Sequence, residues 1–224
     1  SGPETEMDFY DEENQHKLLI AFEMPDANTA DNFSGKYVQE NTYTFDKDLF
    51  ENCQDNVSLH GFFQTEKYFK HIENEIRKDF TFKKDWLEPC KECIEGNEYI
   101  GLHIRRTDYV QKQNYHPLCT LEYYEKALKK LPDTKVIIVS DDPEWCENQS
   151  LFESDRFLVS GSKNNIIDMC ILSLCKYHII ANSSFSWWGA WLAESQKVIA
   201  PKIWFGSQAN LDESDIVPEN WERI

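Results

Sequence analysis

Two adjacent arginines and two adjacent serines are the residues of this sequence best suited to bind a phosphate group. Arg105 and Arg106 follow directly on a β-prone stretch at 99–104, and guanidinium groups bind phosphate oxygens bidentately. Ser183 and Ser184 stand where an apolar run changes into a helical pattern. Hydroxyl groups beside a helix N-terminus suit the same anion. These residue types therefore predict recognition of a phosphorylated ligand.

The serines lie in HIIANSSFSWWGAWLAES, residues 178–195, which is predicted to form a strand, a polar turn and a helix. Residues 178–181 have the length and apolar character of a buried strand, and the residues that follow favour turns and helix N-caps. A strand that leads into a capped helix presents backbone N–H groups and the positive end of the helix dipole, which together bind anions. The alternative is an ordinary strand–helix junction with a tryptophan-rich core helix.

Other ionisable residues surround the arginine pair. Asp108 could hold an arginine in place, and His103 could project from the strand to the same edge. Open α/β sheets bind ligands at the carboxyl ends of their strands, so this edge is a candidate site. The alternatives are a surface ion pair of small energetic weight and a buried structural histidine.

Two acids, Asp141 and Asp142, follow directly on the next predicted strand, 135–140. Asp142 is expected to cap a helix opened by Pro143, which leaves Asp141 as the freer carboxylate. Acids in this position could bind ribose hydroxyls or a base edge, or could serve as metal ligands.

From about residue 99 onward, predicted strands and helices alternate, which indicates βαβ units and a parallel sheet. Helices are predicted at 120–131, 164–176 and 185–195, and further strands at 156–160 and 197–200. Neither G-x-G-x-x-G nor G-x-x-x-x-G-K-[ST] occurs. Phosphate recognition should therefore come from arginines and a serine-capped helix and not from a glycine cradle.

The N-terminal half has weaker patterns. An acidic tail is predicted at 1–16, a strand at 17–22, a strand from residue 56 and a helix over 66–78. The charged, proline-containing stretch 79–97 is the predicted boundary between a shortened N-terminal domain, 1–95, and a Rossmann-like domain, 96–224.

Composition limits the classes of partner. The net charge of -17 argues against nucleic acid and against an anionic membrane surface. Seven cysteines with irregular spacing predict a reducing, cytoplasmic compartment. The isolated pair Cys90 and Cys93 supports a zinc site only weakly. Apolar runs are too short to predict a membrane span.

Several motifs, in this order, resemble those of glycosyltransferase family 11, the α-1,2-fucosyltransferase family. They are HGFFQTEKYF at 60–69, HIRRTDY at 103–109, SDDPEW at 140–145 and NSSFSWWGAWL at 182–192. Trp204 and Phe205 also fit. The glycine-rich GGLGNQMFQYA segment with which family members usually begin is not found here.

The resemblance implies an α/β, GT-B-like fold that transfers L-fucose from GDP-fucose to a galactoside hydroxyl, with inversion and without a metal or other cofactor. A galactose-terminated glycan is the implied acceptor. Arg105, in the HxR motif, would contact the β-phosphate, and Asp141 and His103 would face the nucleoside. Asp108 and His103 are both candidates for the base. The predicted catalytic residues are Arg105, Arg106, Asp108 and His103. The predicted GDP-fucose-binding residues are His103, Arg105, Asp141, Asn182, Ser183, Ser184, Phe185 and Ser186.

Two other functions stay open at this point. One is a catalytically impaired relative that binds a GDP-sugar or a glycan without turnover. The other is a hydrolase or transferase of phosphorylated substrates in which Asp141 and Asp142 hold a metal ion.

Overall fold

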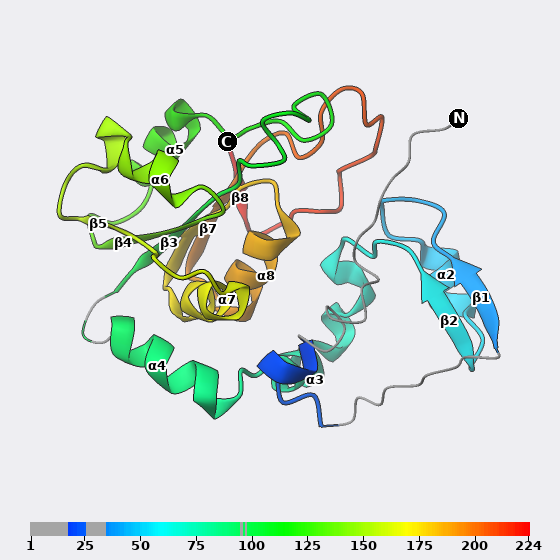
Figure 1. Cartoon of the computed structure of the whole chain (residues 1–224). Helices are drawn as coiled ribbons and strands as arrows, with labels where there is room; N and C mark the ends of the chain where they lie inside the picture. Colours follow the sequence, from blue (N-terminus) through cyan, green and yellow to red (C-terminus); the bar gives the residue numbers. More distant parts are fainter. Residues whose placement is uncertain (1–17, 26–34, 95, 97) are drawn as a thin grey trace.

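A computed structural model describes residues 18–25, 35–94, 96 and 98–224 (Figure 1). The predicted acidic tail at 1–16 lies outside these residues. No helix in the described ranges is long and apolar enough to cross a membrane.

The core of the protein is a six-stranded sheet in which every strand pair is parallel (Figure 1). Its strands are β3 (Ile100–Ile104), β4 (Val136–Ser140), β5 (Phe157–Val159), β6 (Tyr177–Ile179), β7 (Lys197–Ala200) and β8 (Glu222–Arg223). Their order is β5-β4-β3-β6-β7-β8, which is the Rossmann order, and the chain reverses direction across the sheet between β3 and β6. The predicted α/β fold class with a Rossmann-like parallel sheet is confirmed.

Helices cover both faces of the sheet because its strands alternate apolar side chains between two cores. Leu102 and Ile104 share a core with α5 (Leu121–Leu128) and α6 (Pro143–Glu147). On the other face, Ile137 packs with α7 (Asn165–Leu174), and α8 (Ser184–Leu192) lies beside α7. Every strand and helix predicted between 99 and 200 is present, within a few residues of its expected bounds.

Side-chain caps set the start of three helices on this sheet. Thr120 Oγ1 accepts from the Tyr123 N–H, Asp142 Oδ1 from the Trp145 N–H and Asn164 Oδ1 from the Ile166 N–H. The predicted cap at Asp142 is therefore confirmed. Such caps satisfy backbone donors that the first helical turn leaves without an acceptor.

The N-terminal half contains a two-stranded parallel sheet and short helices. Its elements are β1 (Lys36–Gln39), α2 (Lys47–Asn52), β2 (Val57–His60), the 3₁₀ turns η1 (Glu66–Tyr68) and η2 (Lys70–Ile72), α3 (Glu73–Asp79) and α4 (Lys84–Ile94). The helix predicted over 66–78 thus begins as two 3₁₀ turns. The stretch predicted as a charged connection contains α4, whose buried Cys90 packs against α7. The division at residue 95 stays a prediction.

The strand predicted at 17–22 is wrong. Residues 18–21 are helical, and only Phe22 pairs, in an isolated bridge with Phe82. A short apolar run fits either structure, and here burial of Phe22 against Phe82, with ring centres 4.5 Å apart, decides the outcome.

Aromatic contacts join the N-terminal half to α8. The Trp188 ring stacks on Phe69 and on Phe80, each 5.4 Å away between ring centres. Arg77 donates to the Trp191 carbonyl at 2.6 Å and lies 3.9 Å from the centre of the Trp191 ring. Burial of such rings contributes strongly to stability, so α8 supports both halves.

Candidate active site

Arg105 follows the carboxyl end of β3 and is held by two carboxylates. Its Nε donates to Asp108 Oδ1 at 3.0 Å, and its Nη2 lies 2.8 Å from the same oxygen. Its Nε is also 3.3 Å from Asp141 Oδ2. About a third of the Arg105 side chain stays exposed, so a fixed guanidinium group is presented at this edge of the sheet.

Asp141, at the end of β4, is fully engaged and is not the freer acid that the sequence predicts. Its Oδ1 accepts from the Arg106 backbone N–H at 2.8 Å, and its Oδ2 accepts from both the N–H and the hydroxyl of Thr107. These bonds fasten the loop after β3 to the end of β4. Asp141 therefore orients Arg105 and does not offer an unoccupied carboxylate to a nucleoside.

Arg106 points away from the junction of β3 and β6. Its Nε donates to Asp142 Oδ2 at 3.1 Å, and its guanidinium carbon lies 3.8 Å from the centre of the Trp145 ring in α6. Charged contact and cation–π stacking hold it there. Of the two predicted phosphate-binding arginines, the structure places only Arg105 toward the β3–β6 junction. The engagement of both acids by arginines also weakens the metal-binding alternative.

The polar turn after β6 lies beside this arginine. β3 and β6 pair in parallel with Leu102 opposite Ile179, and beyond this pair the chain continues to Arg105 after β3 and to Asn182 after β6, at the same edge of the sheet. The Tyr109 hydroxyl donates to the Asn182 carbonyl at 3.0 Å, and the Arg105 guanidinium carbon lies 5.6 Å from the centre of the Tyr109 ring. Both predicted phosphate-binding groups thus follow strands that end at the same edge of the sheet.

The side chains of the polar turn have different uses. Asn182 is buried, and its amide donates to the Trp204 carbonyl at 2.9 Å. Ser186 is buried and donates to the Ala181 and Ser183 carbonyls. Ser183 is the N-cap residue of α8 but makes no side-chain capping bond within the described structure, and Ser184 is exposed. The hydroxyls available to a ligand are those of Ser183 and Ser184, whereas Asn182 and Ser186 shape the turn.

His103 and Phe185 lie together beneath the N-terminus of α8, with ring centres 5.3 Å apart. His103 is 4% exposed, and its Nδ1 has no hydrogen-bond partner among the described residues. Burial lowers the pKa of His103 to about 3, so the ring is neutral. Because the side chain is enclosed, His103 is poorly placed to deprotonate an acceptor hydroxyl in this structure.

Two buried histidines predict a loss of stability in mild acid. His178 is fully buried between Ser195 Oγ and the Leu172 carbonyl, and burial lowers its pKa to about 4. Like His103, it binds a proton near pH 6.5 when the chain unfolds. Between about pH 6.5 and 4, the unfolded state therefore holds more protons, and the free energy of unfolding should fall as pH falls, by about 1.4 kcal/mol per unit for each ring.

Urea unfolding measured at steps from pH 7.5 to 5 checks this dependence. His178→Gln should remove about half of the pH dependence of the free energy of unfolding that the two rings contribute. This holds whatever the substitution does to stability at pH 7.5. An unchanged slope in that variant would contradict the assignment.

Sequence analysis missed the loop that follows the arginines. The His116 ring stacks on Tyr109, with ring centres 4.8 Å apart and planes 17° apart, and it lies 6.3 Å from the Phe205 ring. Burial raises the pKa of Tyr109 to about 12, which keeps its hydroxyl a donor. Tyr109 and Phe205 stand within quoted motifs, but nothing in the local pattern around His116 marks it.

The family model for glycosyl transferase family 11 matches residues 15–224. The chain belongs to glycosyl transferase family 11.

Relatives with curated names support this assignment. The chain is 35% identical over 195 residues to the α-1,2-colitosyltransferase of Escherichia coli, a match that covers 80% of this chain and 67% of that protein. It is 32% identical to the E. coli O-antigen biosynthesis glycosyltransferase WbnK, covering 78% of this chain and 64% of the relative. It is 23% identical to the rat galactoside α-(1,2)-fucosyltransferase 1, a match that covers 74% of this chain and 55% of that protein. The chain thus spans about two thirds of the bacterial relatives and about half of the rat protein.

Solved structures give weaker matches. POFUT1 in complex with GDP aligns with a TM-score of 0.47 at 12% identity, covering 75% of this chain and 54% of that one. The fucosyltransferase NodZ from Bradyrhizobium aligns with a TM-score of 0.46 at 15% identity, and the match covers 67% of this chain and 57% of that one.

In this family 11 chain, the HGFFQTEKYF segment is anchored by a buried acid, Glu40. Its Oε2 accepts from the N–H groups of Phe62 and Phe63 at 2.9 Å each, and its Oε1 accepts from the Tyr68 hydroxyl at 2.8 Å. Phe63 has a φ of 47°, a conformation unusual for a bulky residue. Lys67 pairs with Asp215, which lies in the half with the six-stranded sheet, at 2.5 Å. These contacts fix the segment to Glu40 and to Asp215.

Proposed function

We propose that this protein is an inverting glycosyltransferase that moves L-fucose from GDP-fucose to a hydroxyl of a galactose-terminated glycan, with an α-1,2 linkage. The observation that carries the proposal is that Arg105 and the turn before α8 follow two neighbouring strands, β3 and β6, between which the strand order reverses, and that Tyr109 contacts both. Rossmann-type sheets bind nucleotides at this point.

Arg105 would stabilise the leaving group. As the bond between fucose and GDP breaks, negative charge increases on the β-phosphate, and a guanidinium group fixed in advance stabilises that charge more in the transition state than in the ground state. Asp108 and Asp141 supply this fixation. Asp108 itself is poorly suited to act as a base, because its charge is already paired with Arg105.

The start of α8 would hold the diphosphate. The first N–H groups of a helix have no intrahelical acceptor and carry partial positive charge. Ser183 and Ser184 add two hydroxyl donors at the same end of the helix. Arginine, backbone N–H groups and hydroxyls together would neutralise the diphosphate, and transfer is expected to continue in the presence of EDTA.

Binding and transfer experiments test this function. Calorimetric titration should show tighter binding of GDP than of UDP or ADP, and mass spectrometry should detect fucose on a galactoside incubated with GDP-fucose. GDP binding without transfer or donor hydrolysis would favour a catalytically impaired relative. Absence of any preference for GDP would reject the proposal.

Colitose is the second candidate for the transferred sugar, because the chain is 35% identical to an α-1,2-colitosyltransferase. Colitose is fucose without the 3-hydroxyl group. A site that hydrogen-bonds this hydroxyl rejects the deoxy sugar strongly, whereas an apolar site separates the two sugars weakly. The ratio of kcat/KM for GDP-fucose and GDP-colitose, measured with one acceptor, decides between the two donors.

A further inference from the structure

Neither base candidate predicted from the sequence is well placed to take a proton from the acceptor. His103 is enclosed beneath α8 and is 4% exposed. Asp108 binds Arg105 through the same oxygen at 3.0 and 2.8 Å. A base for the attacking hydroxyl must be accessible to the acceptor, unpaired and close to Arg105.

His116 has these properties. Its ring is half-buried and stacks on Tyr109, the same ring that lies 5.6 Å from the Arg105 guanidinium carbon. Neither ring nitrogen of His116 makes a hydrogen bond within the described part of the chain, so each is open to a ligand. The imidazole and the guanidinium group therefore both lie against the Tyr109 ring.

The loop that carries His116 is fixed by backbone contacts. The His116 N–H donates to the Lys112 carbonyl at 2.8 Å. The neighbouring Tyr115 carbonyl accepts from the Gly206 N–H at 2.8 Å. A Cβ on Gly206 would lie 2.2 Å from the Asn114 carbonyl oxygen, which shows how closely the two loops approach. A catalytic group needs such fixation to act with correct geometry.

Partial burial favours the neutral form of the His116 ring. Burial lowers the pKa of His116 below its usual value of 6.5, and nearby Lys112 and Arg105 lower it further, while Asp108 opposes them. A neutral imidazole near pH 7 has a free lone pair and can accept a proton.

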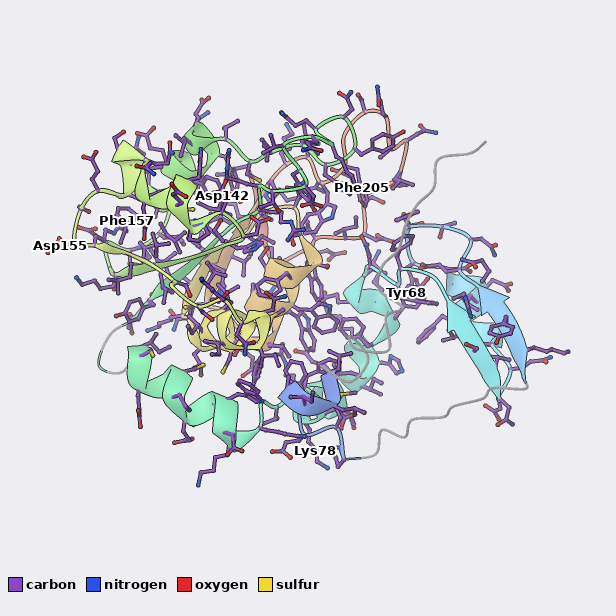
Figure 2. The ribbon with its side chains drawn as sticks, in the orientation of Figure 1. Tyr68, Lys78, Asp142, Asp155, Phe157 and Phe205 are labelled. Carbon is purple, nitrogen blue, oxygen red and sulfur yellow. The ribbon has the colours of Figure 1, made fainter. Side chains whose placement is uncertain are left out.

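Aromatic rings beside His116 offer a place for the acceptor sugar. Phe205, in the half with the six-stranded sheet, meets Tyr43 of the N-terminal half edge-on at 5.8 Å between ring centres, and Tyr43 stacks on Phe62 at 4.8 Å. Figure 2 shows Phe205 and Tyr68 on the facing sides of the two halves. The apolar face of a pyranose ring packs well on such rings, and this row leads to His116.

We propose that His116 is the general base that takes the proton from the acceptor hydroxyl. This proposal rests on the glycosyl transfer proposed above. The galactoside O–H bond breaks as its proton moves to an imidazole nitrogen, and the oxygen forms a bond to the anomeric carbon of the donor sugar. The bond from that carbon to the β-phosphate oxygen breaks, and its electron pair leaves with GDP. The imidazolium then releases its proton to solvent.

The test compares His116→Gln and His116→Ala with wild type and with His71→Gln, an exposed histidine of the N-terminal half. His116→Gln should lose about 10²-fold in kcat for transfer while its GDP dissociation constant stays within about twofold of wild type. The wild-type rate should decline in acid as His116 gains a proton, and this decline should be absent in His116→Gln. Added imidazole should raise the rate of His116→Ala, a rescue that a purely structural role would not produce.

Two results would overturn the role of His116. One is a His116→Gln rate within about threefold of wild type, and the other is an unchanged acid decline in a folded variant that imidazole does not rescue. If the wild-type protein binds GDP but transfers no sugar, the proposed function is wrong, and the role of His116 as a base is wrong with it. The wild-type assay therefore separates the two failures.

Discussion

Arg105→Lys is expected to lower kcat for sugar transfer by about 10²-fold or more, with a small change in thermal stability. Lysine keeps the positive charge but loses the planar fork that Asp108 and Asp141 hold in place. The loss of one fixed charge donor to a developing oxyanion costs about 10² to 10³ in rate. Steady-state assays with saturating donor, together with GDP titration, measure the effect on kcat and on binding separately.

Arg106→Lys is the matched control, because the adjacent arginine points to Asp142 and Trp145. This variant should keep kcat within a few-fold of wild type and lose about 1 kcal/mol of stability through its weaker stacking. Near-wild-type kcat in both variants would show that neither arginine stabilises the leaving group. A large loss in Arg106→Lys alone would mean that Arg106 turns toward the substrate during the reaction.

Asp141→Ala is expected to damage both stability and catalysis. It leaves two backbone N–H groups and the Thr107 hydroxyl without their acceptor and releases one of the two carboxylates on Arg105. Hydrogen bonds to a charged acceptor contribute about 1.5–3 kcal/mol each, and partial solvation of this loop reduces the sum to about 2–4 kcal/mol. For a chain of this size, the melting temperature should fall by about 10 °C, and kcat should fall by about 10²-fold because Arg105 is less well oriented.

Asp142→Ala provides the comparison at the next position. It removes a helix cap and the pair with Arg106 but leaves the loop after β3 attached to β4. Its stability should fall by about 1–2 kcal/mol, with kcat close to that of wild type. Calorimetric melting and steady-state assays on both variants test the difference. Equal losses of kcat would show that Asp141 has no special role in orienting Arg105.

The sequence by itself determined the features that depend on neighbouring residues. Thr120, Asp142 and Asn164 cap their helices through N–H groups two or three residues away, so their roles follow from local chemistry. The strands of the parallel sheet could be predicted because short apolar runs alternate with helical patterns. That Arg105 and the turn with Ser183 and Ser184 follow strands at one edge of the sheet was predictable as well, since parallel strands place their carboxyl ends at one edge.

Only the tertiary structure decided the uses of side chains whose contacts come from distant segments. Asp141 is engaged by residues 34 and 35 positions away, so nothing beside it in the chain shows that it is not free. Arg105 and Arg106 are neighbours of the same type, and the Trp145 ring in α6 is what separates their directions. His116 meets Tyr109 and Phe205 because a close approach at Gly206 joins two loops. Local sequence sets backbone preferences, but the free energy of a polar side chain depends on its partners, and only the folded chain supplies them.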